Sequence, residues 1–145
     1  MSAGRICIRN VDIATIDESA QTAARRMKDR KVGTLVVLSS DSKPVGIVTD
    51  RDLALRVLAE GRDGTQTKVV EVMTPAPNTV RESTPIEDAL RIMRAGAFRR
   101  VPVVNAEDHL VGLLALDDIL ELLAEELTDI GRLMHAEEPA SLGRE

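Results

Sequence analysis

Two stretches of nine residues decide the fold of this chain: Val45-Gly46-Ile47-Val48-Thr49-Asp50-Arg51-Asp52-Leu53 and Val111-Gly112-Leu113-Leu114-Ala115-Leu116-Asp117-Asp118-Ile119. The second lies 66 residues after the first, and their valine, glycine and final aspartate coincide. At the same offset, identical residues face Ala23, Arg25, Met27, Val37 and Glu60. Further upstream, residues 15–19 align with residues 79–83 at an offset of 64, which predicts two extra residues near Thr84-Pro85. The chain is therefore an internal duplication.

Hydrophobic spacing predicts the order strand, helix, strand, strand, helix in each copy. The expected elements are a helix near 20–31, strands at 35–38 and 45–48 and a helix from about 51, then a strand at 79–80, a helix ended by Gly96 and strands at 101–104 and 110–114. A capping box is expected at the start of the second copy's first helix, with Thr84 as N-cap and Glu87 at N3.

A single copy of roughly 60 residues buries too little surface to be stable alone. We therefore predict an α/β fold in which two pseudo-twofold-related βαββα repeats pack into one module. Residues 1–66 are assigned to the first repeat with an N-terminal segment and a linker. Residues 67–130 are assigned to the second repeat, and residues 131–145 to a polar C-terminal tail.

The turn from Gly46 to Asp52 has residues suited to a nucleotide. A glycine in a strand allows another backbone or a ligand to approach closely. The amides at the start of a helix favour an anion, and the Thr49 hydroxyl can join them around a phosphate. Asp52 can accept two hydrogen bonds from a ribose diol, and Arg51 can supply compensating charge. The alternative is a plain helix start, since Thr-x-x-Asp also describes an N-cap followed by an acidic N3 residue.

Several motifs together resemble a known family in order and spacing: the tandem units, the strand Val101-Pro102-Val103-Val104, the turn at 46–53 and the segment Val72-Met73-Thr74-Pro75. Over about residues 6–128 the chain resembles a pair of CBS domains (cystathionine β-synthase-type repeats, the Bateman module). The resemblance implies a non-enzymatic regulatory protein that needs no cofactor. It implies binding of an adenosyl ligand, such as AMP, ADP, ATP or S-adenosylmethionine and sometimes an NAD-type dinucleotide, in the cleft between the repeats. It also implies disc-like homodimers and an unidentified regulated protein.

In that family the motif hydroxyl contacts phosphate and the motif aspartate holds ribose, roles that fall here on Thr49 and Asp52. The expected ligand-binding residues are Thr49, Asp52, Arg51, Asp50, Asp118, Thr15, Thr79, Arg99, Arg100 and Pro102. The second copy departs from the pattern, because Ala115 stands where the hydroxyl belongs and Asp117 where the arginine belongs. We therefore expect asymmetric sites, with Asp118 at most holding a nucleoside. For Arg99 and Arg100, a place in the cleft and a solvated strand entry are equal alternatives.

Composition argues against several classes of protein. Nineteen Lys plus Arg against 24 Asp plus Glu give a net charge of −5, which disfavours nucleic-acid and anionic membrane partners. Phe98 is the sole aromatic residue, and Cys7 is the sole cysteine. We expect Cys7 to be a small buried residue. His109 and His135 lack neighbours at metal-ligand spacing. No phosphate-binding loop or nucleophile–base pair indicates a hydrolase. Without a signal peptide or a long apolar run, a cytoplasmic location is expected.

The last predicted helix carries an apolar stripe with spacings of 3, 4, 3 and 4, formed by Leu120, Leu123, Leu127, Ile130 and Met134. We predict a homodimer to which residues 119–134 contribute; the alternative is that the stripe folds back onto its own core. Two functions remain open. One is an adenosyl-ligand sensor that signals to a partner by conformational change. The other is a ligand-independent interaction module with decayed pockets, an alternative motivated by Ala115.

Overall fold

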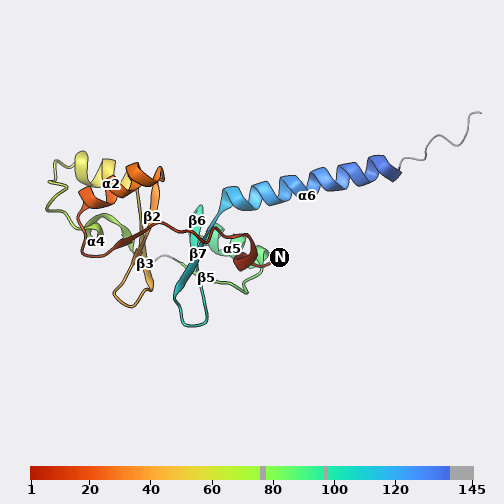
Figure 1. Ribbon diagram of the computed structural model, residues 1–145, viewed down its shortest axis with the longest axis horizontal. Coiled ribbons are helices and arrows are strands. Elements are labelled where there is room, and N and C mark those ends of the chain that lie inside the picture. The colour runs from red at the N-terminus through yellow and green to blue at the C-terminus, as the bar shows by residue number, and fades with distance from the viewer. Residues whose placement is uncertain (76–77, 97, 138–145) are drawn as a thin grey trace, which may run out of the picture.

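The computed structural model describes residues 1–75, 78–96 and 98–137, and each copy in it forms a small sheet with helices on its outer side (Figure 1). The sheet orders are β1-β2-β3-β4 and β5-β6-β7. In both sheets the first strand runs parallel to the second, which forms an antiparallel hairpin with the third. The strands are β1 (Ile13–Thr15), β2 (Thr34–Leu38), β3 (Pro44–Thr49), β4 (Thr74–Pro75), β5 (Val80–Arg81), β6 (Arg100–Val104) and β7 (Leu110–Ala115). The predicted α/β fold with two repeated units is confirmed.

The helices that the hydrophobic spacing predicts are present: α2 (Ala20–Arg30), α3 (Asp50–Leu53) with its π-helical continuation η1 (Ala54–Leu58), α5 (Ile86–Gly96) and α6 (Leu116–Glu137). Two further short helices, α1 (Ala3–Ile6) and α4 (Val69–Val72), are not among the elements that the sequence predicts. α2 begins where the Ser19 hydroxyl accepts a hydrogen bond from the Thr22 amide (3.1 Å). It ends at Lys31, whose φ of 56° is left-handed.

Strand pairing corrects the alignment of the two copies. Ala14 pairs with Val37 and Val80 pairs with Val103, so the first strands correspond at an offset of 66. The predicted offset of 64 is wrong, and the second copy has no extra residues at that point. Strands of two or three residues carry too few side chains to define their own register, which here comes from the neighbouring strand.

The predicted capping box of α5 is also wrong. The Thr84 hydroxyl accepts a hydrogen bond from the Arg81 amide (3.0 Å) and so closes the turn after β5. α5 begins after Pro85, and the amide of Ile86 donates to the carbonyl of Met1 (3.1 Å). A residue far away in the sequence therefore satisfies the helix start that Thr84 was expected to satisfy.

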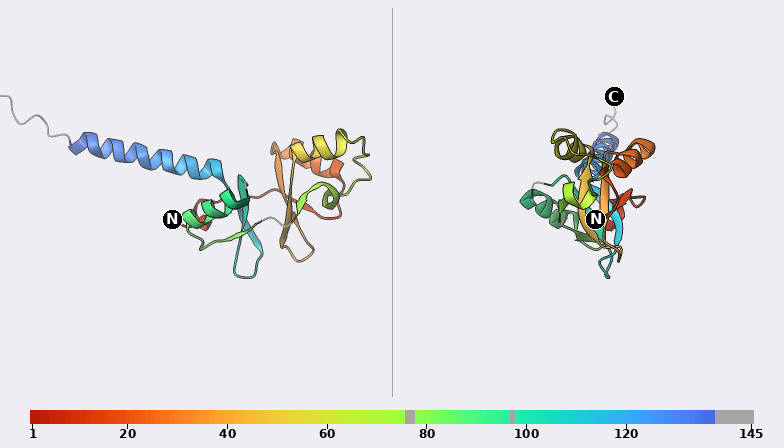
Figure 2. Two further views of the ribbon diagram at one scale, coloured as in Figure 1. Left: turned by 180° about the vertical axis from the view of Figure 1, so that it is seen from behind. Right: turned by 90° about the vertical axis from the view of Figure 1, so that its left-hand side faces the viewer.

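The central strands are buried on both faces. Alternate side chains pack under the helices of their own unit, namely Leu35 and Val37 in β2 and Val101 and Val103 in β6. Between them, Val36 and Pro102 are fully buried on the opposite faces, where the two sheets meet (Figures 1 and 2). The contact between the sheets thus joins two small cores into one module.

The two units exchange their leading segments. α1 packs on the second unit, where Ala3 is fully buried and Ile8 exchanges two backbone hydrogen bonds with Leu113, each 2.9 Å. α4 packs on the first unit through Val69 and Val72. The boundaries drawn from the repeat stay a prediction, but each core includes a segment that precedes the other unit in the chain.

α6 leaves the second unit and extends away from the body of the molecule (Figure 1). Ile119 in its first turns is buried in the second core, whereas Leu123, Leu127 and Ile130 are exposed. The alternative that this stripe folds back onto its own core is therefore wrong for the part of α6 that the structure describes. Residues 131–137 of the predicted tail continue the helix, and residues 138–145 lie outside the described range.

Candidate functional site

A cavity of about 260 Å³ lies between the two units and takes residues from both. It is lined by Thr34, Ile47, Thr49, Thr74, Asn78, Phe98, Arg99 and Arg100. Thr34 pairs with Thr49 across β2 and β3, and Ile47 pairs with Thr74 across β3 and β4. Three adjacent strands therefore form one wall, and the entry to β6 forms the other.

Thr49 and Asp52 form a complete capping box at the start of α3. The Thr49 hydroxyl accepts from the Asp52 amide (3.2 Å), and Asp52 Oδ2 accepts from the Thr49 amide (2.9 Å). The other carboxylate oxygen, Oδ1, lies 3.7 Å from Nε of Arg56. The Asp52 side chain is 15% exposed and does not line the cavity, whereas Thr49 does. The Thr49 hydroxyl keeps its own proton free to donate.

The residues between them are turned elsewhere. Asp50 Oδ1 accepts from the Arg51 amide (2.8 Å), and the Asp50 amide donates to the carbonyl of Gly33 (3.0 Å). Arg51 is exposed and forms no ion pair with any carboxylate in the described ranges. Neither Asp50 nor Arg51 lines the cavity, and their predicted roles as ligand contacts stay predictions.

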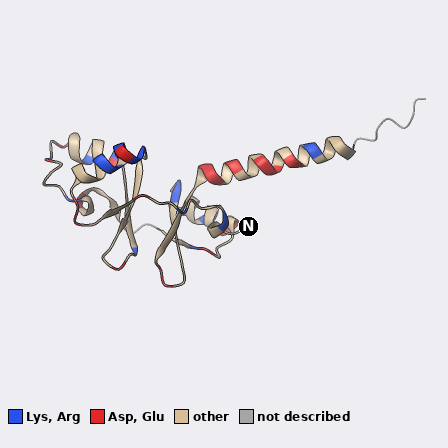
Figure 3. Cartoon of the chain, viewed as in Figure 1, with Lys and Arg blue, Asp and Glu red and all other residues tan. Residues whose placement is uncertain are grey.

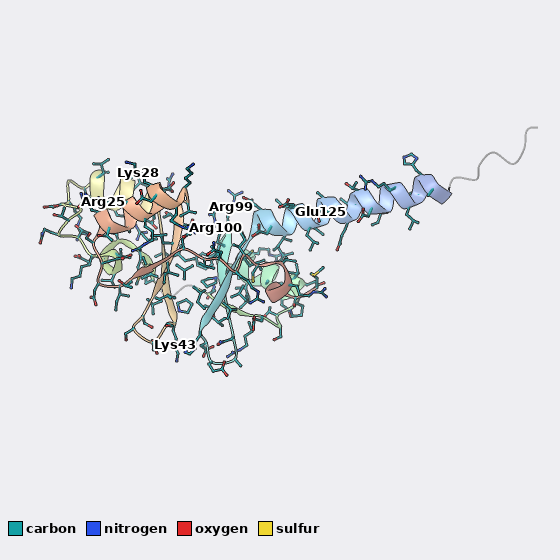
Figure 4. The ribbon with its side chains drawn as sticks, in the orientation of Figure 1. Arg25, Lys28, Lys43, Arg99, Arg100 and Glu125 are labelled. Carbon is teal, nitrogen blue, oxygen red and sulfur yellow. The ribbon has the colours of Figure 1, made fainter. Side chains whose placement is uncertain are left out.

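Arg99 and Arg100 lie between the two units (Figure 4) and provide the positive charge of the cavity. The carbonyl of Arg99 accepts from the Leu116 amide (2.8 Å), which holds this entry to β6 against the start of α6. Within residues 1–75, 78–96 and 98–137, neither guanidinium pairs with a carboxylate. Of the two alternatives for this pair, their position agrees with a place in the cleft.

A second cavity of about 250 Å³ occupies the pseudo-symmetric position. It is lined by Ile8, Asn10, Val11, Asp12, Val32, Gly33, Thr34, Arg100 and Leu113. At the offset of 66, Gly33 stands where the first cavity has Arg99, and Asp12 where it has Asn78. The second cavity therefore has one arginine fewer and one carboxylate more, which disfavours an anion.

Asp118 forms only half of the corresponding capping arrangement. Its Oδ2 accepts from the Ala115 amide (3.2 Å), but Ala115 has no hydroxyl to accept a bond in return. Neither residue lines the second cavity. The inequality of the two sites, which rests on this difference in side chains, stays a prediction.

Three other predicted residues do not line either cavity. Thr15 lies at a separate hollow beside the ion pair of Glu18 and Arg26. Thr79 is exposed next to Asn78, and Pro102 is fully buried where the sheets meet. Because the copies align at 66, Thr15 and Thr79 are not equivalent positions. No ligand tests these residues, so their assignment stays a prediction.

Sequence reasoning missed the walls of the first cavity. Ile47 lies two residues before Thr49 and therefore on the same face of the strand. The alternation of side chains along a strand could have predicted that Ile47 lines the cavity with Thr49. Thr34 and Thr74 enter only through strand register, which the sequence did not define. Phe98 lies over Gly96, where an added Cβ would lie 2.2 Å from Cε2 of the ring.

The glycine that recurs at the same position of both copies, Gly46 and Gly112, allows close packing. A Cβ at Gly46 would lie 2.4 Å from Sδ of Met73, and one at Gly112 would lie 2.5 Å from Sγ of Cys7. A glycine in a strand allows either a ligand or another part of the chain to approach closely, and here the neighbour is another part of the chain. Burial raises the pKa of the Cys7 thiol, which is therefore not activated as a nucleophile.

Over the described residues, no three His, Cys, Asp or Glu side chains gather closely enough to hold a metal ion. None of the described helices combines the length and apolarity needed to cross a bilayer.

Comparison with known proteins gives a consistent result. The family model of the CBS domain matches residues 3–59 and 69–125. The CBS domain-containing protein YhcV of Bacillus subtilis is 39% identical, over 74% of this chain and 76% of YhcV. The uncharacterized protein MK0525 of Methanopyrus kandleri is 28% identical over 84% of this chain, which spans 62% of that protein. The structure of CBSX2, a CBS-pair protein of Arabidopsis thaliana, in complex with AMP matches with a TM-score of 0.71 and 30% identity, over 86% of this chain and 96% of CBSX2.

Proposed function

Since the chain belongs to the CBS-domain family as a tandem pair, we propose that it is a non-enzymatic regulatory module that binds an adenosyl ligand of the AMP, ADP, ATP or S-adenosylmethionine class. The ligand would bind in the first cavity, between the two sheets. The observation that carries this proposal is the lining of that cavity, where Thr49 comes from one unit and Arg99 and Arg100, which form no ion pair among the described residues, come from the other.

The lining supports a ligand with one charged and one apolar end. Arg99 and Arg100 offer bidentate donors for a phosphate, and the Thr49 hydroxyl adds a further donor. Ile47 and Phe98 offer an apolar surface for a flat base. The volume of about 260 Å³ is close to the lower end of the range, roughly 300–1,000 Å³, in which small-molecule sites fall.

Ligand binding would act on the arrangement of the two units. A molecule held by Thr49 from one unit and by Arg99 and Arg100 from the other stabilises the arrangement in which these groups converge. A regulated protein that binds that arrangement more tightly than others would then receive the signal. The size of the signal is limited by the difference in ligand affinity between the two arrangements.

Isothermal titration of protein stripped of co-purified ligand tests the proposal. The titrants are AMP, ADP, ATP, S-adenosylmethionine, NADH and adenosine. We expect saturable binding of at least one phosphorylated compound, and at least about a tenfold loss of its affinity in an Arg99→Ala/Arg100→Ala variant. Adenosine, which lacks phosphate, should lose less. Arg94→Ala, an exposed arginine on α5 outside the cavity, is the matched control.

One observation favours the alternative of a ligand-independent interaction module. In the capping box, Thr49 and Asp52 satisfy each other's backbone amides with their side chains. The fold therefore needs no ligand at this turn. Under that alternative, none of the titrants binds at millimolar concentration, and the arginine variant behaves as the wild type does.

A further inference from the structure

Arg56 connects two segments that lead to the first cavity. It is the middle residue of η1, and its Nη1 donates to the carbonyls of Val72 (3.2 Å) and Met73 (3.1 Å). Its Nε lies 3.7 Å from Oδ1 of Asp52. Turns of π-helix are rare and occur frequently at functional sites. One guanidinium group thus joins the start of α3 to the end of α4.

The two carbonyls lie at the C-terminal end of α4, where the last acceptors of a helix have no partners within the helix. Val72 is fully buried and Met73 is 8% exposed. A buried carbonyl needs a hydrogen bond, and a charged donor makes a stronger one than a neutral donor does. Arg56 therefore stabilises the positions of Val72 and Met73.

Met73 directly precedes β4, so its position decides where β4 begins. In β4, Thr74 pairs with Ile47 of β3, and both residues line the first cavity. Ile47 is one of the residues that offer an apolar surface for the base. Arg56 itself does not line the cavity. It therefore acts on this wall indirectly, through the segment that enters β4.

On its other side, Arg56 sets the direction of the Asp52 carboxylate. Oδ2 of Asp52 is fixed by the Thr49 amide (2.9 Å), whereas Oδ1 takes no part in the capping box. The guanidinium group lies near Oδ1, so the two carboxylate oxygens are held by different partners. A ribose that reaches Asp52 would bind Oδ1, the oxygen whose direction Arg56 holds.

The second copy has a different residue at the position of Arg56. At the offset of 66, α1 corresponds to α4 and Leu122 corresponds to Arg56. A leucine side chain has no donor for the carbonyls at the end of a helix. From residue 116 to residue 131, α6 has no Lys or Arg, and its charged side chains are carboxylates (Figure 3). This part of α6 therefore cannot provide the connection that Arg56 provides in the copy with Thr49.

We propose that Arg56 is a positioning residue for the adenosyl ligand. It holds Thr74 in the wall beside the base and Oδ1 of Asp52 beside the ribose, so it acts on the nucleoside part of the ligand. The phosphate falls to Arg99 and Arg100 at the opposite wall. This inference rests on the proposed function, in which an adenosyl ligand binds in the first cavity.

Isothermal titration of Arg56→Leu, which introduces the residue of the second copy, tests the proposal. The titrants are AMP, ATP, S-adenosylmethionine and adenosine, and the protein is stripped of co-purified ligand. We expect each compound that binds the wild type to lose affinity by the same factor, at least about fivefold, because all four share the nucleoside. By contrast, Arg99→Ala/Arg100→Ala should weaken AMP more than adenosine. Arg94→Leu, at an exposed arginine of α5, is the control and should bind as the wild type does.

Two further variants separate positioning from general destabilisation. Arg56→Lys should bind within about threefold of the wild type, because an ammonium group keeps a charged donor between Asp52 and the carbonyls. In an Asp52→Ala background, Arg56→Leu should lower affinity by a smaller factor than in the wild type, because part of its effect passes through Asp52. Hydrogen exchange of the ligand-free protein should be faster at residues 72–74 in Arg56→Leu and unchanged in Arg94→Leu.

The outcomes distinguish a failure at Arg56 from a failure of the proposed function. A wild type that binds none of the four compounds would overturn both. Unchanged affinity in Arg56→Leu, with faster exchange and a lower melting temperature, would show that Arg56 only stabilises the fold and would overturn its positioning role alone. A larger loss for AMP than for adenosine in that variant would place Arg56 at the phosphate and overturn that role as well. Losses that multiply fully with those of Asp52→Ala would do the same, because Arg56 would then act independently of Asp52.

Discussion

Thr49 serves both a helix start and a cavity wall, whereas its capping partner Asp52 serves the helix start and does not line the cavity. Their reciprocal hydrogen bonds hold the first turn of α3, and the same bonds fix the Thr49 side chain at the edge of the cavity. The capping bond uses Oδ2 of Asp52. Its other oxygen, Oδ1, takes no part in the capping box and lies near Arg56. Structural and binding roles at this turn are therefore compatible, and only an affinity measurement separates them.

Replacing Asp52 by Ala should lower nucleotide affinity at least about tenfold, because the ribose would lose a charged acceptor. It should also destabilise the protein by about 1 kcal/mol through the lost cap. Asp118→Ala, at the pseudo-equivalent position, is the control and should change affinity less. Titration calorimetry and thermal unfolding measure the two effects. A lower melting temperature with unchanged affinity would assign Asp52 to the helix start alone.

Gly46→Ala should destabilise the chain by roughly 1–3 kcal/mol, because the new methyl group would overlap Sδ of Met73 and the carbonyl of Thr74. Gly131→Ala is the matched control, since nothing lies within 4 Å of its added Cβ and the position is helical. That change should stabilise the chain by up to about 1 kcal/mol. Urea unfolding compares the two, and equal effects would mean that the contact at Gly46 relaxes freely.

At the scale of elements, α1 and α4 show that chain order and packing partner differ. α1 is first in the sequence but belongs to the second core, and α4 follows the first unit and completes its core. The exchange ties the two units together, because neither core is complete without a segment connected to the other. Cys7, directly after α1, is placed to report on this docking.

Cys7 should react slowly with iodoacetamide at pH 7.5 while α1 is docked, because burial raises the pKa of its thiol. The raised pKa of Cys7 also makes the fold more stable at low and neutral pH than at high pH. This stabilisation is complete below the ordinary thiol pKa and is lost as the pH rises through the higher folded value. Ala3→Asp, which charges a fully buried residue of α1, should speed alkylation and lower the unfolding midpoint. Unchanged alkylation in that variant would show that α1 is not held by Ala3.

At the scale of the whole molecule, α6 divides into a core part and an outer part. A chain truncated after Ala124 keeps Ile119 in the second core. Its unfolding midpoint and its affinity for nucleotide should therefore remain close to those of the full chain. It lacks Leu127, Ile130 and Met134, so it should sediment as a monomer. A truncated chain that stays dimeric would place the contact between copies elsewhere.

The sequence by itself determined the duplication, the α/β pattern of each copy and the position of Thr49 at a strand-to-helix turn. These features are local, and they depend on apolar periodicity and on a repeat offset that counting reveals. The register of the short first strands, the start of α5 and the partners of α1 and α4 were decided only by the tertiary structure. So were Thr34, Thr74 and Phe98 as walls of the cavity. Each depends on which distant segment supplies the neighbouring hydrogen bonds or apolar surface, and a short segment carries too few side chains to specify that partner.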